Sequence, residues 1–215
     1  MRKLFWKIVS WFKGPPSPPP PAVQPLPIAI PTAPDNETKL RDLLVDYWKK
    51  DLGQFETDGS NRSEMIDSIN RRLKVPLGSP YCIGGLLVRG VEALCKQLSL
   101  VNPIPMTAGT QNFYNLAPLK YRNPIGKGLA KKGDIGILVN KYDAGHGHAF
   151  GFREDETEDQ QLTVEYNTDK AGSRNGDGVH ELTRLQSGTL TKRYRGSVDV
   201  VKMILDANKE MIFGI

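Results

Sequence analysis

Apolar residues follow two different periods along this chain, and the first is helical. Between residues 35 and 98 they recur every three or four positions, which is the spacing of amphipathic helices. We expect one helix over 35–52, a second that begins at Ser63, and a third from Cys82 to about Leu98. A stretch rich in proline and glycine, 76–80, separates the second helix from the third.

Beyond residue 133 the period shortens to that of β-strands. Short runs of β-branched and aromatic residues are bounded by glycines and polar turns, at 134–139, 148–153, 162–167, 179–184 and 194–203. Helices first and short strands afterwards predict an α+β domain over 35–215, in which N-terminal helices pack on an antiparallel β-sheet.

Residues 1–13 form a separate amphipathic segment. Aliphatic and aromatic side chains share one helical face and lysines share the other, which predicts a helix lying at a membrane interface. It is too short to span a bilayer. A divergent secretory signal or uncleaved tether, or a tail without function, are the alternatives.

Residues 14–34 are rich in proline and contain no charged side chain from 15 onward. Such a segment is extended and semi-rigid, so we expect a disordered Pro-rich arm rather than part of a core. A ligand for a proline-binding module is the alternative.

Charge is unevenly distributed. The net charge is +5, and four of these charges lie in residues 1–13, which leaves 35–215 nearly neutral. Without a basic patch interleaved with aromatic residues, we expect no nucleic-acid partner. We also expect a monomer.

The two cysteines differ in their surroundings. On one helix, Cys82 and Cys95 would be about 20 Å apart along the axis, too far for a disulfide, so we expect two free thiols. Cys95 has the pattern of a buried helix residue. Cys82 follows a Gly/Pro turn at a helix start, where unpaired N–H groups and the helix dipole favour thiolate. A small core residue is the simpler interpretation of Cys82.

Partners for a cysteine nucleophile occur downstream. We expect His148 as the base, because strand alternation begins there, with His146 as the competing base. Glu165 would hold the imidazole, and strand alternation places Asn167 on the same face, where it would orient the ring or donate to an oxyanion. His180 has the pattern of an exposed strand position.

No metal or cofactor is expected. Glu56, Asp58 and Ser60 offer oxygens at alternate positions, but a calcium loop needs more carboxylates, so we predict a solvated loop. Three histidines without paired Cys/His spacing do not match a structural zinc site.

Several motifs, in this order, resemble the CHAP family, the cysteine, histidine-dependent amidohydrolases/peptidases of the NlpC-type papain-like group. They are Glu56 to Arg62, Gly78 to Cys82, Gly133-Asp134-Ile135, Gly145 to Phe152, Glu165-Tyr166-Asn167-Thr168, and Asn175 to Val179 leading to Arg184. The chain departs from the family at Tyr81, where the family has Trp, at Ile83-Gly84-Gly85, where the family has a small-small-aromatic run, and at Tyr166, which replaces Gly.

The resemblance implies a papain-like fold and cysteine-dependent cleavage of a muropeptide amide in peptidoglycan, as in lysins and wall-remodelling amidases or endopeptidases. The catalytic set would be Cys82, His148, Glu165 and Asn167. The protein would act at the cell envelope, or as a secreted or phage-associated enzyme, with residues 1–13 as a membrane tether. A catalytically inactive CHAP-like binding or structural module, or a papain-like enzyme that acts on protein, are the alternatives.

Overall fold

The computed structural model describes residues 35–124, 128–140, 147–157, 160–172, 176–185 and 193–212. The predictions for the interfacial helix 1–13 and the Pro-rich arm 14–34 lie outside these residues, as does the competing base His146.

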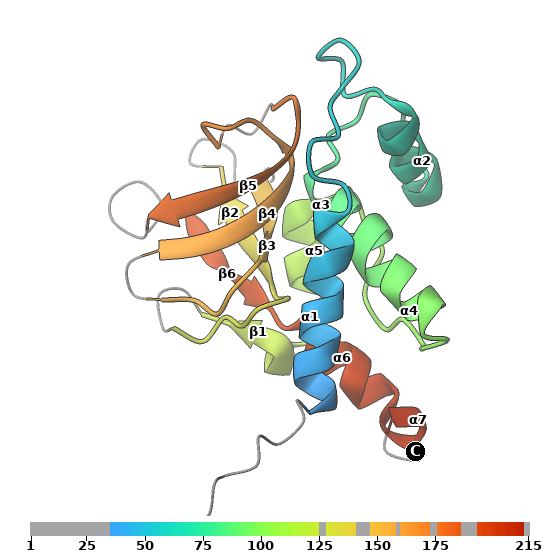
Figure 1. The fold of residues 1–215 in the computed structure, drawn as a ribbon, viewed down its shortest axis with the longest axis vertical. Coiled ribbons are helices and arrows are strands. Elements are labelled where there is room, and N and C mark those ends of the chain that lie inside the picture. Colours follow the sequence, from blue (N-terminus) through green and yellow to red (C-terminus); the bar gives the residue numbers. More distant parts are fainter. Residues whose placement is uncertain are drawn as a thin grey trace, which may run out of the picture. The chain divides into compact units, whose positions relative to one another are not determined.

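The described chain forms a helical layer packed against a β-sheet (Figure 1). The helices are α1 (Asn36–Lys49), α2 (Glu64–Leu73), α3 (Cys82–Gly85), the π-helix η1 (Leu86–Glu92), α4 (Ala93–Gln97), α5 (Thr110–Leu116), the 3₁₀-helix η2 (Leu119–Tyr121), α6 (Val200–Ala207) and α7 (Lys209–Ile212). The strands are β1 (Arg122–Asn123), β2 (Ile135–Val139), β3 (Gly147–Phe152), β4 (Gln160–Thr168), β5 (Gly178–Leu185) and β6 (Tyr194–Val198).

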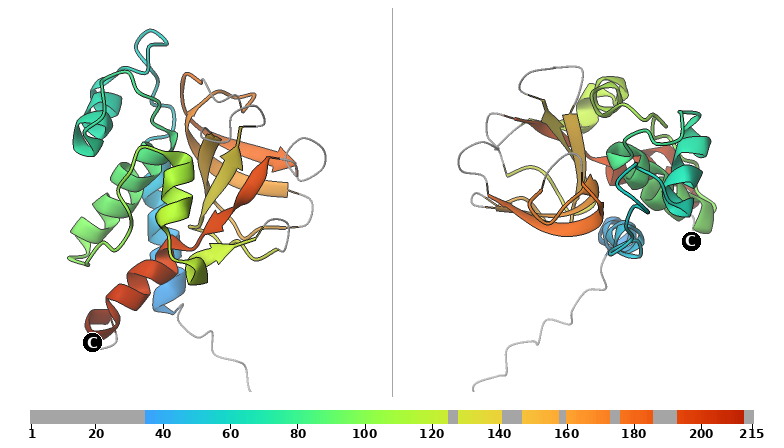
Figure 2. Two further views of the ribbon diagram at one scale, coloured as in Figure 1. Left: turned by 180° about the vertical axis from the view of Figure 1, so that it is seen from behind. Right: turned by 90° about the horizontal axis from the view of Figure 1, so that it is seen from above.

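The six strands form one sheet in the order β1-β6-β2-β3-β4-β5, and every neighbouring pair is antiparallel. Two further views show the helices gathered on one side of this sheet (Figure 2). The predicted α+β class, with N-terminal helices packed on an antiparallel sheet, is confirmed.

Local capping explains where the first helices begin. Asp35 accepts a hydrogen bond from the Thr38 backbone N–H at 2.8 Å and caps α1. Ser63 accepts one from the Ile66 N–H at 3.2 Å and caps α2. Each side chain satisfies an N–H that the helix itself leaves free, so both helices start where the sequence predicts them.

The predicted helix from Cys82 to about Leu98 is a continuous helical run whose middle turn is a π-helix, η1. The buried Trp48 indole on α1 donates to the Leu86 carbonyl at 3.0 Å, at the start of η1. Gly85 and Gly90 let this run approach its neighbours, because a Cβ at Gly85 would overlap the Tyr166 ring and one at Gly90 would overlap Trp48. The run therefore packs closely against both α1 and β4.

The expected strand over 194–203 is wrong in its second half. Strand β6 ends at Val198, and Asp199 accepts a hydrogen bond from the Lys202 N–H at 2.9 Å to begin α6. The apolar run after Asp199 is compatible with a strand or a helix, and the Asp199 carboxylate favours the helix because it caps the first turn.

Apolar side chains form two clusters, one on each face of the sheet. Ala149, Val164 and Tyr166 belong to the main core against the helices, whereas Phe150 and Phe152 belong to a smaller cluster. Since side chains alternate along a strand, Phe150 and Phe152 point to the opposite face of β3 from Ala149. None of the described helices is long and apolar enough to cross a membrane.

Candidate active site

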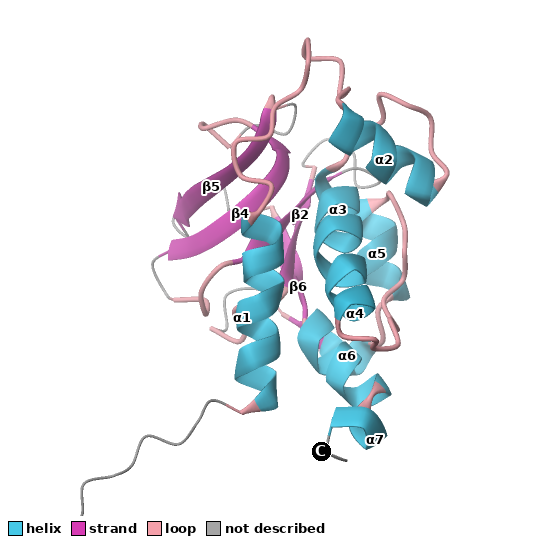
Figure 3. Cartoon of the chain, turned by 45° about the vertical axis from the view of Figure 1, so that its right-hand side comes forward, coloured by secondary structure: helices cyan, strands magenta, loops and turns pink. Residues whose placement is uncertain are grey.

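Cys82 is the first residue of the long helical run, and its helix packs against β3 and β4. Figure 3 shows this run beside the strands of the sheet. The side chain is only 5% exposed, and it is a free thiol, as is Cys95. The predicted pair of free thiols is therefore confirmed, and Cys82 lies at a helix start facing the sheet.

His148 and Glu165 lie on neighbouring strands and contact each other directly. His148 Nε2 is 2.8 Å from Glu165 Oε2, and both side chains are buried. The other ring nitrogen, Nδ1, is buried and has no hydrogen-bond partner among the described residues. With Nε2 held by Glu165, Nδ1 is the ring nitrogen left for another group.

Cys82 interacts with this imidazole. Burial raises the pKa of the Cys82 thiol, but the proximity and the charge of the His148 imidazole outweigh burial and lower the pKa to about 7. Burial lowers the pKa of His148, but its contacts with Cys82 and Glu165 outweigh burial and raise it to about 9. Each group therefore favours the charged form of the other, which favours a thiolate–imidazolium pair over two neutral groups.

Glu165 is held as a carboxylate by a residue that the sequence reasoning did not assign to the site. Arg184 on β5 donates to both oxygens of Glu165 at 2.5 Å, and Thr163 Oγ1 donates to Oε1 at 2.7 Å. Burial raises the pKa of Glu165, but the hydrogen bonds from Arg184 and His148 outweigh burial and lower it to about 2. A fixed anion therefore lies behind the imidazole at neutral pH.

Asn167 does not follow the strand alternation that predicted its position. The register of β4 shifts between Tyr166 and Thr168, and Asn167 has a left-handed φ of 55° at this bulge. A bulge inserts a residue and breaks the two-residue period, so regular alternation with Glu165 does not extend to Asn167. The side chain is 1% exposed, and its Oδ1 has no hydrogen-bond partner among the described residues.

A pocket of about 390 Å³ opens at Cys82. Cys82, Gly147 and Asn167 line it together with residues from the turn 75–80 and from 108–110, at the start of α5. Asn167 thus shares a cavity with the thiol, whereas Glu165 orients the ring. Thr110 lies on the wall of this pocket, with Oγ1 3.5 Å from Cys82 Sγ.

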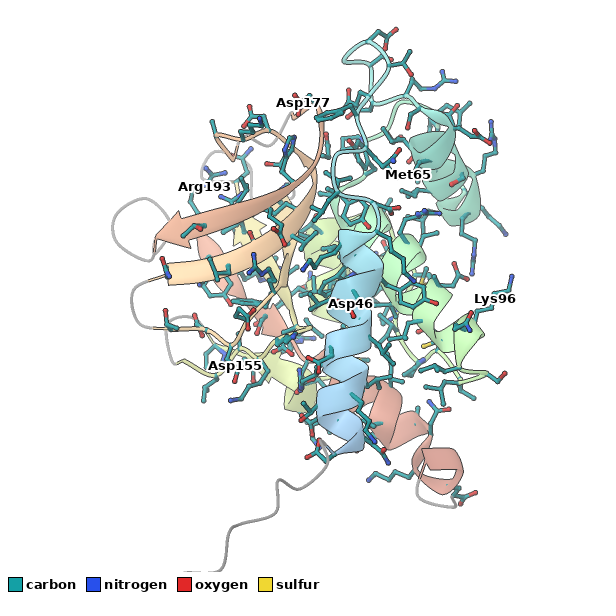
Figure 4. The ribbon with its side chains drawn as sticks, in the orientation of Figure 1. Asp46, Met65, Lys96, Asp155, Asp177 and Arg193 are labelled. Carbon is teal, nitrogen blue, oxygen red and sulfur yellow. The ribbon has the colours of Figure 1, made fainter. Side chains whose placement is uncertain are left out.

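His180 does not occupy the exposed position that the sequence pattern predicts. It is 8% exposed and lies opposite Glu165 in the register of β4 and β5. Its Nε2 is 2.7 Å from Asp177 Oδ1, and Phe55 packs edge-on against its ring. Asp177, labelled in Figure 4, directly precedes the first residue of β5. The imidazole is buried by the Phe55 ring and by the loop that carries Phe55, which lies against β5.

Two of the oxygens considered for a calcium loop accept local hydrogen bonds. Glu56 Oε2 accepts from the Asn61 N–H at 2.8 Å, and Asp58 Oδ1 accepts from the Ser60 N–H at 3.2 Å. Among the residues that the structure describes, no three acidic, histidine or cysteine side chains form a group that could hold a metal ion.

The sequence pattern did not indicate two residues of this site, Arg184 and Thr110, for different reasons. Arg184 reaches Glu165 across β4 and β5, so only the pairing of those strands shows the contact. Thr110 belongs to α5, a helix in a stretch for which the pattern predicted no element. Comparisons with family models, curated proteins and solved structures found no match to this chain.

Proposed function

We propose that this protein is a cysteine amidase or endopeptidase that cleaves an amide bond of peptidoglycan, with a papain-like, CHAP-type catalytic domain. One observation supports the chemistry above the others. The Cys82 thiol lines a pocket, interacts with the His148 imidazole and has a lowered pKa, and the imidazole in turn contacts the Glu165 carboxylate. The peptidoglycan substrate rests on the ordered motifs that resemble the CHAP family.

In this mechanism the Cys82 thiolate attacks the amide carbonyl, and the C–S bond forms as the carbonyl π electrons move to oxygen. The imidazolium of His148 then gives its proton to the leaving amine as the C–N bond breaks. His148 then takes a proton from water, the resulting hydroxide attacks the thioester carbonyl, and the C–S bond breaks. This releases the acid product and restores the Cys82 thiolate and the His148 imidazolium. Glu165 keeps the ring oriented and stabilises its charged form throughout.

The negative oxygen of the tetrahedral intermediate needs hydrogen-bond donors. The backbone N–H of Cys82, at the start of the helical run, is one donor, and the Asn167 side-chain amide in the same pocket is the other. Loss of one donor of this kind costs about 3–4 kcal/mol of transition-state stabilisation, so an Asn167 variant retains some activity.

Residues 1–13 would hold the enzyme near a membrane, and 14–34 would act as a spacer to the wall. This part of the proposal rests on sequence pattern alone.

The decisive test compares the two cysteines in the clearing of purified peptidoglycan. Cys82→Ala removes the nucleophile and abolishes clearing, while Cys95→Ala, the matched control, retains it. Circular dichroism establishes that both variants are folded. Retained clearing by Cys82→Ala would refute the proposal.

Mass spectrometry of the products then identifies the bond that is cut. Release of free stem peptides or of separated cross-links supports a wall enzyme, and cleavage of a protein substrate with no wall products supports the papain-like alternative. An inactive CHAP-like module would produce no change in either substrate.

A further inference from the structure

The wall of the pocket that faces the nucleophile brings a hydroxyl group to the sulfur. Thr110 is the first residue of α5, and its Oγ1 lies 3.5 Å from Cys82 Sγ. Both side chains are buried, and both line the same pocket. The contact joins segments 28 residues apart in sequence, so it results from the packing of α5 against the sheet.

We propose that Thr110 is a further catalytic residue, whose hydroxyl donates a hydrogen bond to the Cys82 thiolate. The proposal rests on the proposed role of Cys82 as the nucleophile. In the resting enzyme this donor holds the sulfur as an anion and directs it toward the pocket. Once the sulfur is acylated it is neutral, and the hydrogen bond weakens.

The energetics of a buried anion support this role. A thiolate removed from water needs donors to replace the water it has lost, since an unpaired buried charge is costly. A hydrogen bond to an ionised group is roughly twice as strong as one between neutral groups. Thr110 Oγ1 contacts Cys82 Sγ whether or not the sulfur is protonated. The hydrogen bond is stronger to the anion, so it favours the thiolate over the thiol.

The position of Thr110 is fixed by its neighbour rather than by its own hydroxyl. Gln111 Nε2 donates to the Leu138 carbonyl at 2.9 Å, and Gln111 Oε1 accepts from Arg195 Nη1 at 2.6 Å. These bonds tie the start of α5 to β2 and β6, beside the sheet in Figure 2. The Thr110 hydroxyl is thus held at the sulfur and has Sγ as its partner among the described residues.

The test measures how the alkylation rate of Cys82 by iodoacetamide depends on pH in the full chain. Peptide mass spectrometry follows Cys82 separately from Cys95. Thr110→Val keeps the shape and removes the hydroxyl, while Thr110→Ser keeps the hydroxyl. A hydrogen bond of ordinary strength predicts that Thr110→Val alkylates about three- to tenfold more slowly than the wild type at pH 6–7.

The profile of Thr110→Val should shift to higher pH, and the rates should converge above the shifted pKa. Thr110→Ser should follow the wild type. If Thr110→Val and the wild type share one profile, or if Thr110→Ser behaves as Thr110→Val does, the hydroxyl only fills space and the proposal is overturned. Thr110→Ala replaces Thr110→Val should the latter fail to fold.

Peptidoglycan clearing, measured in parallel, separates this proposal from the proposed function. A shifted alkylation profile in Thr110→Val, with no clearing by the wild type, supports the Thr110 bond and refutes the wall substrate. Clearing by the wild type with an unshifted profile in Thr110→Val does the reverse.

Discussion

The two cysteines occupy the two ends of one helical run, and they are opposite in their acid–base properties. Cys82 is 5% exposed and Cys95 is 2% exposed, and burial raises the pKa of each thiol. Yet the pKa of Cys82 is lowered to about 7, whereas that of Cys95 is raised to about 11. Similar burial therefore does not decide the chemistry of a thiol in this protein.

The difference comes from the groups that face each sulfur. Around Cys82 these are the imidazole of His148, the hydroxyl of Thr110 and the backbone of Ala149, all of which lower its pKa. The carboxylate of Glu92 is the charged neighbour of Cys95, and it raises the pKa further. Figure 4 shows Lys96, the residue after Cys95, on the side of α4 away from the sheet that holds His148. A thiol at the sheet gains donors that a thiol at the other end of the run does not.

Removing the imidazole should make Cys82 resemble Cys95. In His148→Gln, burial is no longer opposed by His148, so the thiol pKa rises and the proposed general acid is lost. Peptidoglycan clearing should fall by about 10²–10⁴-fold, the usual contribution of general acid–base catalysis. The matched control is His180→Gln, which removes the other described histidine that pairs with a carboxylate. If both variants lose activity equally, the contrast between the cysteines does not arise from His148.

Arg184 tests how far the arrangement around Cys82 extends. In Arg184→Met, burial of Glu165 is opposed mainly by His148, so the Glu165 pKa rises from about 2. Breaking a buried ion pair from one side should lower the free energy of unfolding at pH 7 by about 3–5 kcal/mol. Urea denaturation measures this loss. Arg153→Met, which removes a surface ion pair to Glu181, should cost no more than about 1 kcal/mol.

The loss in Arg184→Met should also depend on pH with a definite sign. Because the pKa of Glu165 is lower in the folded protein than its ordinary value of 4.5, the folded wild type is stabilised at pH values above 4.5. This stabilisation disappears as the pH falls from 4.5 through about 2. The difference between wild type and variant should therefore be largest at neutral pH and shrink in acid. An equal difference at pH 7 and pH 3 would mean that Glu165 is not the group through which Arg184 acts.

Direct alkylation of the wild type compares the two thiols under one condition. Brief treatment with iodoacetamide at pH 7 should modify Cys82 about a hundredfold faster than Cys95, because the larger thiolate fraction is partly offset by lower intrinsic nucleophilicity. Peptide mapping by mass spectrometry measures both rates in one sample. Equal rates would remove the chemical distinction between the two ends of the helical run.

The chain's local patterns predicted much of this architecture. Asp35 and Ser63 marked the helix starts because a capping side chain bonds to an N–H only two or three residues away. The change of period predicted the α+β class. Where the local pattern was ambiguous, the prediction failed, as in the apolar run that follows Asp199.

Predictions about side-chain surroundings succeeded less often. Strand alternation placed Asn167 on the face of Glu165, and the pattern around His180 predicted an exposed position. The alternation is interrupted at Asn167, and His180 is buried. A bulge at Asn167 breaks the period, and the loop that carries Phe55 buries His180. A bulge and a covering loop both depend on residues distant in sequence, so a local pattern does not contain them.

The sequence by itself determined the residue types and their order: a cysteine at a helix start, a histidine at a strand start, and a glutamate within a later strand. Only the tertiary structure decided which groups meet. The pairing of β4 with β5 brings Arg184 to Glu165, and the packing of α5 brings Thr110 to Cys82. Electrostatic and hydrogen-bond energies depend on distance in space, so the pKa of each thiol depends on which groups the folded chain brings near its sulfur.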